Sequence, residues 1–253
     1  MKLFYLSVCL CASMLFFAGC QSIQSELPAT IMIPRALTPV VVDGNANDEI
    51  WKTTASYSYC LPVANVEKDE LTSCTPKMPA EVQFAYDKDY FYVLAKFTDD
   101  DVLQYGEENF EHLYKTGDVL ELFLMSVKSE HYWEIYGTPN ALHSLMFFPN
   151  KGRVIFPFAI KKDSVVLVTS TVNGTLNHWQ DRDKGAVIEM AVSMKDLTKY
   201  GDEIGPGTQW KLLAARYNYS VTLSEGVELS TFPQLPVANY HNRDGYINIE
   251  FAK

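Results

Sequence analysis

The sequence has little basic charge for its length. Across 253 residues, 21 Lys and Arg side chains stand against 31 Asp and Glu side chains, and the formal net charge is −10. Nucleic acids and anionic lipid headgroups both require basic footprints on a protein surface. The acidic balance therefore argues against nucleic acid as a partner and favours a neutral ligand or cations.

Motifs that carry catalysis are also missing. The sequence has no nucleophile elbow, no closely spaced pair of histidines and no phosphate-binding loop. A glycosidase would need two carboxylates across a cleft, and Glu121 and Glu134 could be offered, but any acidic β-protein supplies such a pair. We therefore predict that the protein is not an enzyme.

Long apolar runs are limited to one stretch at the start of the sequence. It extends from Leu3 to Phe17, follows Lys2 and ends at Ala18-Gly19-Cys20. A secretory signal typically has a basic residue, a short apolar core and small residues at the cleavage site, as this stretch does. The stretch is also short for a transmembrane helix. The cysteine at the cut resembles the lipobox of bacterial lipoproteins, although an ordinary signal peptide with an incidental cysteine remains an alternative.

The lipobox resemblance implies how the ends of the chain are organised. Residues 1–19 would be a lipoprotein signal peptide, Cys20 would carry the lipid, and residues 20–30 would form a flexible tether. Residues 31–253 would form a single domain. The protein would then be anchored by lipid in a bacterial cell envelope. The outer membrane is favoured, because residue 21 is glutamine and not the aspartate that is associated with retention in the inner membrane.

Cysteines are few beyond the signal. Cys60 and Cys74 are the two that remain after Cys20, and thiols in an oxidising compartment tend to pair. We predict a Cys60–Cys74 disulfide, with two separate buried thiols as the alternative. Neither cysteine lies in a close pair with another cysteine or histidine, which argues against zinc.

The dominant pattern is an alternation of period two, rich in Val, Ile, Phe and Tyr and broken by turn residues. Many short strands at even spacing predict an all-β sandwich or barrel. One short helix is expected at Met194–Tyr200, with Ser193 as its N-cap. The expected strands are Glu81–Tyr86, Tyr90–Phe97, Val119–Met125, Tyr132–Tyr136, Leu142–Phe148, Val154–Phe158, Ser164–Ser170, Ala186–Val192, Trp210–Tyr219 and Ile247–Phe251.

Two acidic residues interrupt this alternation. In Val119–Met125 the three leucines share one face, so Glu121 lies on the other face among large apolar neighbours. A desolvated acid is costly unless it is hydrogen-bonded, so Glu121 serves either a ligand or a structural salt bridge to an arginine such as Arg216. In the next strand Glu134 alternates with aromatic residues, a combination that suits sugars but also suits a tyrosine-rich core.

Three consecutive carboxylates follow the strand that ends at Phe97. Asp99 and Asp101 belong to this run, and carboxylate oxygens are ligands that Ca²⁺ prefers. The run matches no EF-hand spacing and is equally compatible with a solvated turn. A structural calcium ion is therefore a weak expectation, and no other cofactor is predicted.

The order of several motifs resembles family 9 carbohydrate-binding modules and their relatives over residues 38–253. No single motif is specific, but their order is. The matching segments are DGNANDEIW (Asp43–Trp51), AEVQFAYDKDYFYVLAKFTDDDV (Ala80–Val102), GDVLELFL (Gly117–Leu124), YWEIYGTPN (Tyr132–Asn140), NGTLNHWQDRDKGAVIEMAVSMKDL (Asn173–Leu197) and GTQWKLLAARYN (Gly207–Asn218).

The resemblance implies an antiparallel β-sandwich that holds a sugar between two aromatic side chains. By motif position, Tyr114 falls near the first aromatic and Phe232 near the second, and both are tryptophans in sugar-binding members. Glu121 matches the family's strand glutamate, and Trp133 stands where such members carry an arginine. The expected carbohydrate-binding residues are Tyr114, Glu121, Trp133, Glu134, Tyr136, Arg216 and Phe232.

These features predict a non-catalytic lipoprotein that holds glycan or sugar ends at the cell surface. Three alternatives stay open. The first is a glycosidase-associated or catalytic domain. The second is a haem carrier related to DOMON domains, for which Met125, His143 and Met146 are the candidate ligands, although methionines more commonly fill cores. The third is a structural lipoprotein that docks a partner.

Overall fold

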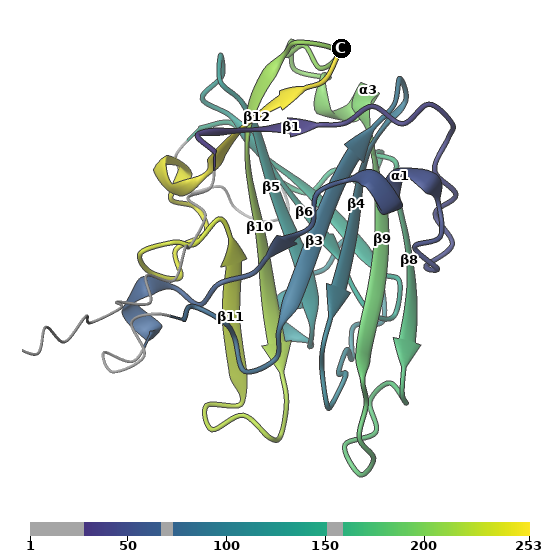
Figure 1. The fold of residues 1–253 in the computed structure, drawn as a ribbon, viewed down its shortest axis with the longest axis vertical. Coiled ribbons are helices and arrows are strands. Elements are labelled where there is room, and N and C mark those ends of the chain that lie inside the picture. The colour runs from purple at the N-terminus through teal and green to yellow at the C-terminus, as the bar shows by residue number, and fades with distance from the viewer. Residues whose placement is uncertain (1–27, 67–72, 151–158) are drawn as a thin grey trace, which may run out of the picture.

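The structure is a computed structural model and describes residues 28–66, 73–150 and 159–253. Its helices are short, and strands make up most of the regular secondary structure (Figure 1). The strands are β1 (Thr30–Ile33), β2 (Tyr57–Ser58), β3 (Ala80–Tyr86), β4 (Tyr90–Phe97), β5 (Val119–Ser126), β6 (Tyr132–Gly137), β7 (His143–Phe148), β8 (Val166–Asn173), β9 (Gly185–Ser193), β10 (Gln209–Tyr219), β11 (Val227–Phe232) and β12 (Ile247–Phe251). The helices are α1 (Glu49–Thr53) and α3 (Met194–Leu197), with 3₁₀ turns η1 (Val63–Asn65), η3 (Leu113–Lys115) and η4 (Arg243–Gly245).

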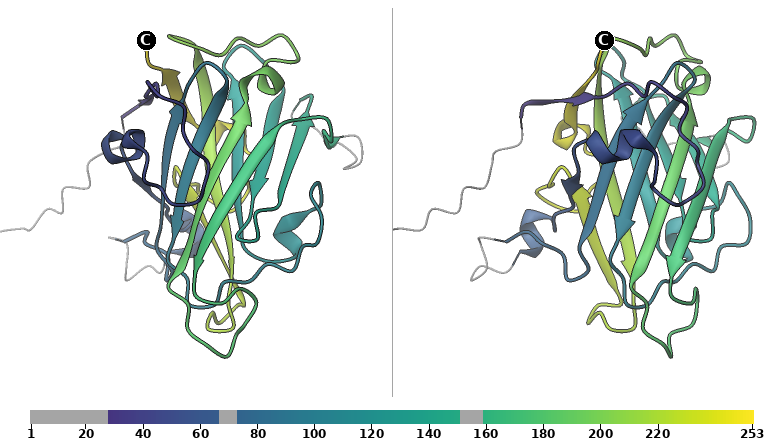
Figure 2. Two further views of the ribbon diagram at one scale, coloured as in Figure 1. Left: turned by 90° about the vertical axis from the view of Figure 1, so that its right-hand side faces the viewer. Right: turned by 45° about the vertical axis from the view of Figure 1, so that its right-hand side comes forward.

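The strands form two sheets that pack as a sandwich, as Figures 1 and 2 show. The seven-stranded sheet has the order β1-β12-β10-β5-β6-β7, with β11 also paired to β10, and the five-stranded sheet has the order β2-β3-β4-β9-β8. All strand pairs are antiparallel except β1 with β12. The predicted all-β sandwich is confirmed.

The largest hydrophobic core lies between the sheets and follows the alternation of the strands. Leu120, Leu122 and Leu124 of β5 point into it, as the sequence predicts, together with Trp133 and Ile135 of β6. Side chains at the alternating positions of β5 and β6 therefore emerge on the outer face of the seven-stranded sheet. Loop segments cover this outer face and bury a second layer of apolar side chains.

The expected helix and strands differ from the structure in several places. The helix α3 is shorter than Met194–Tyr200, although Ser193 caps it by accepting a hydrogen bond from the Asp196 N–H. The expectation of only one helix is wrong, because α1 forms a single turn at Glu49–Thr53. Strands β1, β2 and β11 have no counterpart among the expected strands, and Val154–Phe158 lies outside the described residues.

The turn that carries α1 is held to the outer face of the five-stranded sheet by one carboxylate. Glu189 Oε2 accepts hydrogen bonds from the backbone N–H groups of Asp43 and Gly44, and its Oε1 accepts one from Trp51 Nε1 at 3.0 Å. Trp51 is buried against Tyr92 and other residues of the same apolar cluster. Packing and hydrogen bonding to β9, rather than helix propensity, therefore place this single turn.

The predicted disulfide is present and closes a short loop. Cys60 and Cys74 are bonded, with a Cα–Cα distance of 4.8 Å. The backbone of Cys60 also pairs with Thr231 of β11, so the loop is fixed to the edge of the seven-stranded sheet. None of the helices in the described ranges has the length and apolar character that crossing a membrane requires.

Candidate functional site

A pocket of about 350 Å³ opens on the outer face of the seven-stranded sheet. Its floor comes from neighbouring strands: β5 supplies Glu121 and Phe123, and β6 supplies Glu134 and Tyr136. The 3₁₀ turn η3 and the loop between β11 and β12 form walls around this floor. Four of the seven expected carbohydrate-binding residues thus line one pocket: Tyr114, Glu121, Glu134 and Tyr136.

The two glutamates are diagonal neighbours at the bottom of the pocket. Glu121 pairs with Tyr136 across the sheet and Phe123 pairs with Glu134, so both carboxylates project from the same face. Glu121 is 2% exposed and Glu134 is 5% exposed. The Tyr136 hydroxyl donates a hydrogen bond to Glu134 Oε1, while the buried Oε2 atom has no hydrogen-bond partner.

Burial and mutual repulsion shift the titration of both glutamates. Desolvation raises the pKa of Glu134 to about 7, and the hydrogen bond from Tyr136 offsets part of that rise. Desolvation also raises the pKa of Glu121 well above its ordinary value, and the nearby charge of Glu134 raises it further. At neutral pH the pair therefore holds protons that exposed glutamates would have released.

Tyrosines enclose the carboxylates on the side of η3 and β10. The half-buried rings of Tyr114 and Tyr217 lie 5.2 Å apart, and Tyr114 packs edge-on against Tyr136. The ring of Tyr217 meets Tyr240 edge-on at 5.6 Å. Burial raises the pKa of Tyr114 and Tyr217, and the charge of Glu121 adds to both shifts, so these hydroxyls stay protonated at neutral pH.

Two histidines stand at the mouth of the pocket. His241 Nδ1 lies 2.9 Å from the Tyr132 hydroxyl and 4.0 Å from Glu134 Oε2. Burial lowers the pKa of His241, and burial followed by the charge of Lys115 lowers the pKa of His112. Both rings are therefore neutral at neutral pH and do not compensate the charge of the carboxylates.

Three of the expected site residues lie outside the pocket. Trp133 belongs to the inner face of β6 and packs against Phe147 and Tyr200. Phe232 belongs to the inner face of β11, where it stacks on Tyr57 at 4.5 Å. Because the faces of a strand alternate, neither ring reaches the outer face on which Glu121 lies.

Arg216 also lies away from the pocket and does not pair with Glu121. Its fully buried guanidinium donates to Asp99 Oδ2 at 2.8 Å, to Asn218 Oδ1 and to the backbone carbonyls of Met78 and Thr98. The guanidinium carbon also lies 4.5 Å from the ring centroid of Phe97. The structural salt bridge considered for Glu121 is thus made by Asp99.

The two candidate calcium ligands serve the protein itself. Asp99 pairs with Arg216 and accepts a hydrogen bond from the Asp101 backbone N–H, while Asp101 accepts one from the Val221 N–H. Desolvation raises the pKa of Asp99 despite the opposing effect of Arg216. Across the part of the chain that the structure describes, no group of three or more His, Cys, Asp or Glu side chains is arranged to hold a metal ion.

Several pocket residues were not anticipated from the sequence. The alternation of β10 could have indicated Tyr217. Ala215 of β10 pairs with Glu121, and Tyr217 lies on the same face of β10 as Ala215. The loop residues have no periodicity that could have placed them. The lining residues not expected to bind carbohydrate are His112, Phe123, Met146, Phe148, Tyr217, Ala238, Asn239, Tyr240 and His241.

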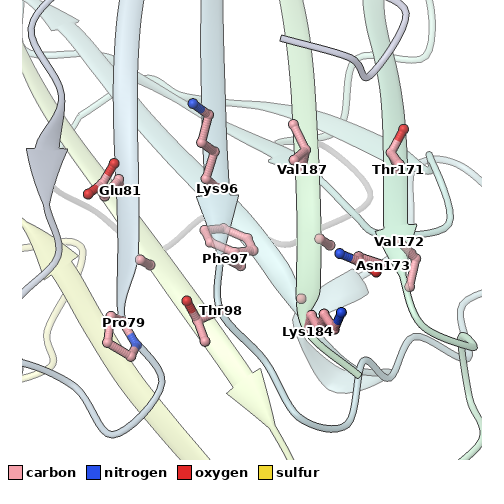
Figure 3. A pocket seen from close by; sticks show the side chains of 13 residues that line it. Pro79, Glu81, Lys96, Phe97, Thr98, Thr171, Val172, Asn173, Lys184 and Val187 are labelled. Atoms are coloured by element: carbon pink, nitrogen blue, oxygen red, sulfur yellow. The ribbon is translucent and has the colours of Figure 1, made fainter. Parts of the chain in front are cut away.

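A second hollow, of about 570 Å³, lies on the other sheet. Figure 3 shows Glu81, Lys96, Val187 and Thr171 side by side on four neighbouring strands, and their register makes them one row across β3, β4, β9 and β8. The lining of this hollow carries both signs of charge and one aromatic ring, that of Phe97, which belongs to the core. Its chemistry is that of a polar sheet surface, so the pocket at Glu134 is the stronger candidate.

Fold and site together define a β-sandwich with a tyrosine-walled, acid-floored pocket on one outer face. A family model described as "Carbohydrate family 9 binding domain-like" matches residues 42–205. The chain therefore belongs to this family of non-catalytic carbohydrate-binding modules, which confirms the resemblance seen in the sequence motifs.

Solved structures share the fold at low sequence identity. A candidate carbohydrate-binding protein from Bacteroides uniformis has a TM-score of 0.68 and 10% identity, covering 88% of this chain and 98% of the other. A family 9 module from Caldicellulosiruptor kristjanssonii in complex with cellotriose has a TM-score of 0.52 and 14% identity, covering 88% and 93%. A family 9 module from the same organism in complex with glucose has a TM-score of 0.53 and 13% identity, covering 88% of this chain and 96% of the other. No curated protein matches the chain.

Proposed function

We propose that the protein binds carbohydrate, without catalysis, in the pocket floored by Glu121 and Glu134. The observation that carries this proposal is the placement of two buried carboxyl groups beside the half-buried rings of Tyr114 and Tyr217. Sugar C–H faces stack on aromatic rings while hydroxyls bond to fixed polar groups. The free Oε2 atom of Glu134 is an acceptor suited to such a hydroxyl.

The size of the pocket limits what enters it. Its volume of about 350 Å³ is at the low end of the range for small-molecule sites. This volume suits one sugar unit or the end of a glycan better than the middle of a chain. The family relative solved with glucose supports a single sugar unit as the ligand, and the one solved with cellotriose supports the end of a short glucan.

Titration calorimetry of the purified protein with glucose and cellotriose tests the proposal. Replacing Tyr114 with alanine removes one wall, and we expect binding to weaken about tenfold, equivalent to about 1.4 kcal/mol. The matched control is Tyr105→Ala, because Tyr105 is 58% exposed and lies outside the pocket. Failure of both sugars to bind at millimolar concentration, or equal loss in the two variants, would refute the proposal.

The location of the protein is a separate part of the proposal. Lipid on Cys20 would anchor the domain in a bacterial cell envelope, with the outer membrane favoured, and the lipobox-like sequence that ends at Cys20 supports it. Metabolic labelling with a tagged fatty acid tests this, because Cys20→Ser should abolish both labelling and membrane recovery. Labelling that survives the substitution would contradict the proposed anchor.

A further inference from the structure

The charged groups that face the pocket are predominantly acidic. Glu121 and Glu134 form the floor, and the side chains around them are tyrosines, apolar residues and neutral histidines. The nearby basic side chains do not line the pocket: the exposed Lys115 lies 5.6 Å from the ring centroid of Tyr114, and Arg243 is bonded to Glu130. An entering cation would therefore meet acids without displacing a resident basic group.

The acidic floor also has a free acceptor aimed at the ligand. Glu134 is only 5% exposed. Its Oε1 atom accepts a hydrogen bond from Tyr136, whereas its Oε2 atom makes no hydrogen bond. A buried carboxylate oxygen without a partner is costly, and an N–H donor from a charged group relieves that cost more than a hydroxyl does.

The walls favour a cation as well. The rings of Tyr114, Tyr136, Tyr217 and Phe148 contribute to the pocket lining, and aromatic faces attract ammonium groups more strongly once water has been removed. Cages of aromatic rings bind quaternary ammonium ligands through the same attraction. A neutral sugar uses the rings for stacking alone.

We infer that the pocket selects a sugar that carries an unsubstituted amino group, whose ammonium binds Glu134 Oε2 at the floor while its ring lies against Tyr114 and Tyr217. This inference rests on the proposed carbohydrate-binding function and names the ligand class. Binding would return both glutamates toward their ionised forms, because a positive charge nearby lowers the pKa of a carboxyl group. Protons held by the pair would leave as the ligand enters.

Calorimetry at pH 6.5 with glucosamine, glucose and N-acetylglucosamine tests the inference. We expect glucosamine to bind at least tenfold more tightly than the other two, and its affinity to fall as salt rises because the contact is ionic. Titration in two buffers of different ionisation enthalpy should show proton release for glucosamine and none for glucose. Ethanolamine, an amine without a sugar ring, should bind more weakly than glucosamine.

Glu134→Gln supplies the matched variant, because it keeps the shape of the side chain and removes its charge. It should weaken glucosamine binding about tenfold more than it weakens glucose binding, so that the preference for the amino sugar is lost. Glu225→Gln, on an exposed loop outside the pocket, should change neither. Retained helical and sheet signals in circular dichroism would show that Glu134→Gln has folded.

The outcomes distinguish a failure of the amino-sugar inference from a failure of the proposed carbohydrate-binding function. Glucose binding as tightly as glucosamine would overturn the inference and leave the carbohydrate-binding proposal standing. Ethanolamine binding as tightly as glucosamine would also overturn it, because the sugar ring would then contribute nothing. Absence of binding by every sugar would overturn both.

Discussion

Replacing Glu134 with glutamine should change how the stability of the protein depends on pH. In the folded protein the pKa of Glu134 is raised from 4.5 to about 7, chiefly by desolvation. Between these two pH values the native state holds a proton that the unfolded chain has released. The free energy of unfolding therefore falls as pH rises through this window.

The size of the effect follows from the shift. A rise in pKa from 4.5 to about 7 corresponds to about 3 kcal/mol of lost stability once Glu134 is fully ionised. Below pH 4.5 this contribution vanishes, because the carboxyl group is protonated in both states. Glutamine cannot ionise. The advantage of Glu134→Gln over wild type in free energy of unfolding should therefore grow by roughly 2 to 3 kcal/mol as the pH rises from 5 to 8.

Urea unfolding of both proteins at pH 5, 6, 7 and 8 measures this difference directly. The difference between the two curves also contains the part of the Glu121 shift that the charge of Glu134 causes, because the two carboxyl groups are coupled. Glu225→Gln is the control, because Glu225 lies on an exposed loop and its curve should follow that of wild type. A constant difference between wild type and Glu134→Gln across the whole range would refute the reasoning.

Three further changes test the framework around the site. Asp99→Asn leaves the buried guanidinium of Arg216 without its charge partner and should lower the free energy of urea unfolding by about 3 to 5 kcal/mol, whereas a loss below about 1 kcal/mol would contradict the buried pair. Reducing the disulfide of Cys60 should cost about 3 kcal/mol, and an unchanged midpoint of thermal unfolding would contradict this. Trp51→Phe removes a donor to Glu189 and should cost about 1 to 3 kcal/mol, while an unchanged urea midpoint would count against that hydrogen bond.

Much of the fold was predictable because strand alternation is a local property. The leucines of β5 fix which of its faces points into the core between the sheets, and the same rule places Glu121 on the other face. The turn at Trp51 was not predictable in this way. Its single helical turn depends on a hydrogen bond to Glu189, more than a hundred residues away in the chain.

The site was predictable only in part, because alternation within a strand does not fix how neighbouring strands align. Glu121 and Glu134 meet because β5 and β6 pair in a register that makes them diagonal neighbours. Arg216 seemed available to Glu121 from the sequence, but it pairs with Leu120 and therefore faces the core. Tyr240 and His241 reach the pocket on a loop without periodicity, so only the folded structure places them there.

A crystal structure of the protein with bound glucosamine tests the account most directly. We predict that the sugar ring lies against Tyr114 and Tyr217, with its amino group within hydrogen-bonding distance of Glu134 Oε2. A sugar found instead on the Glu81–Lys96 row of the other sheet, with the pocket empty, would contradict the account.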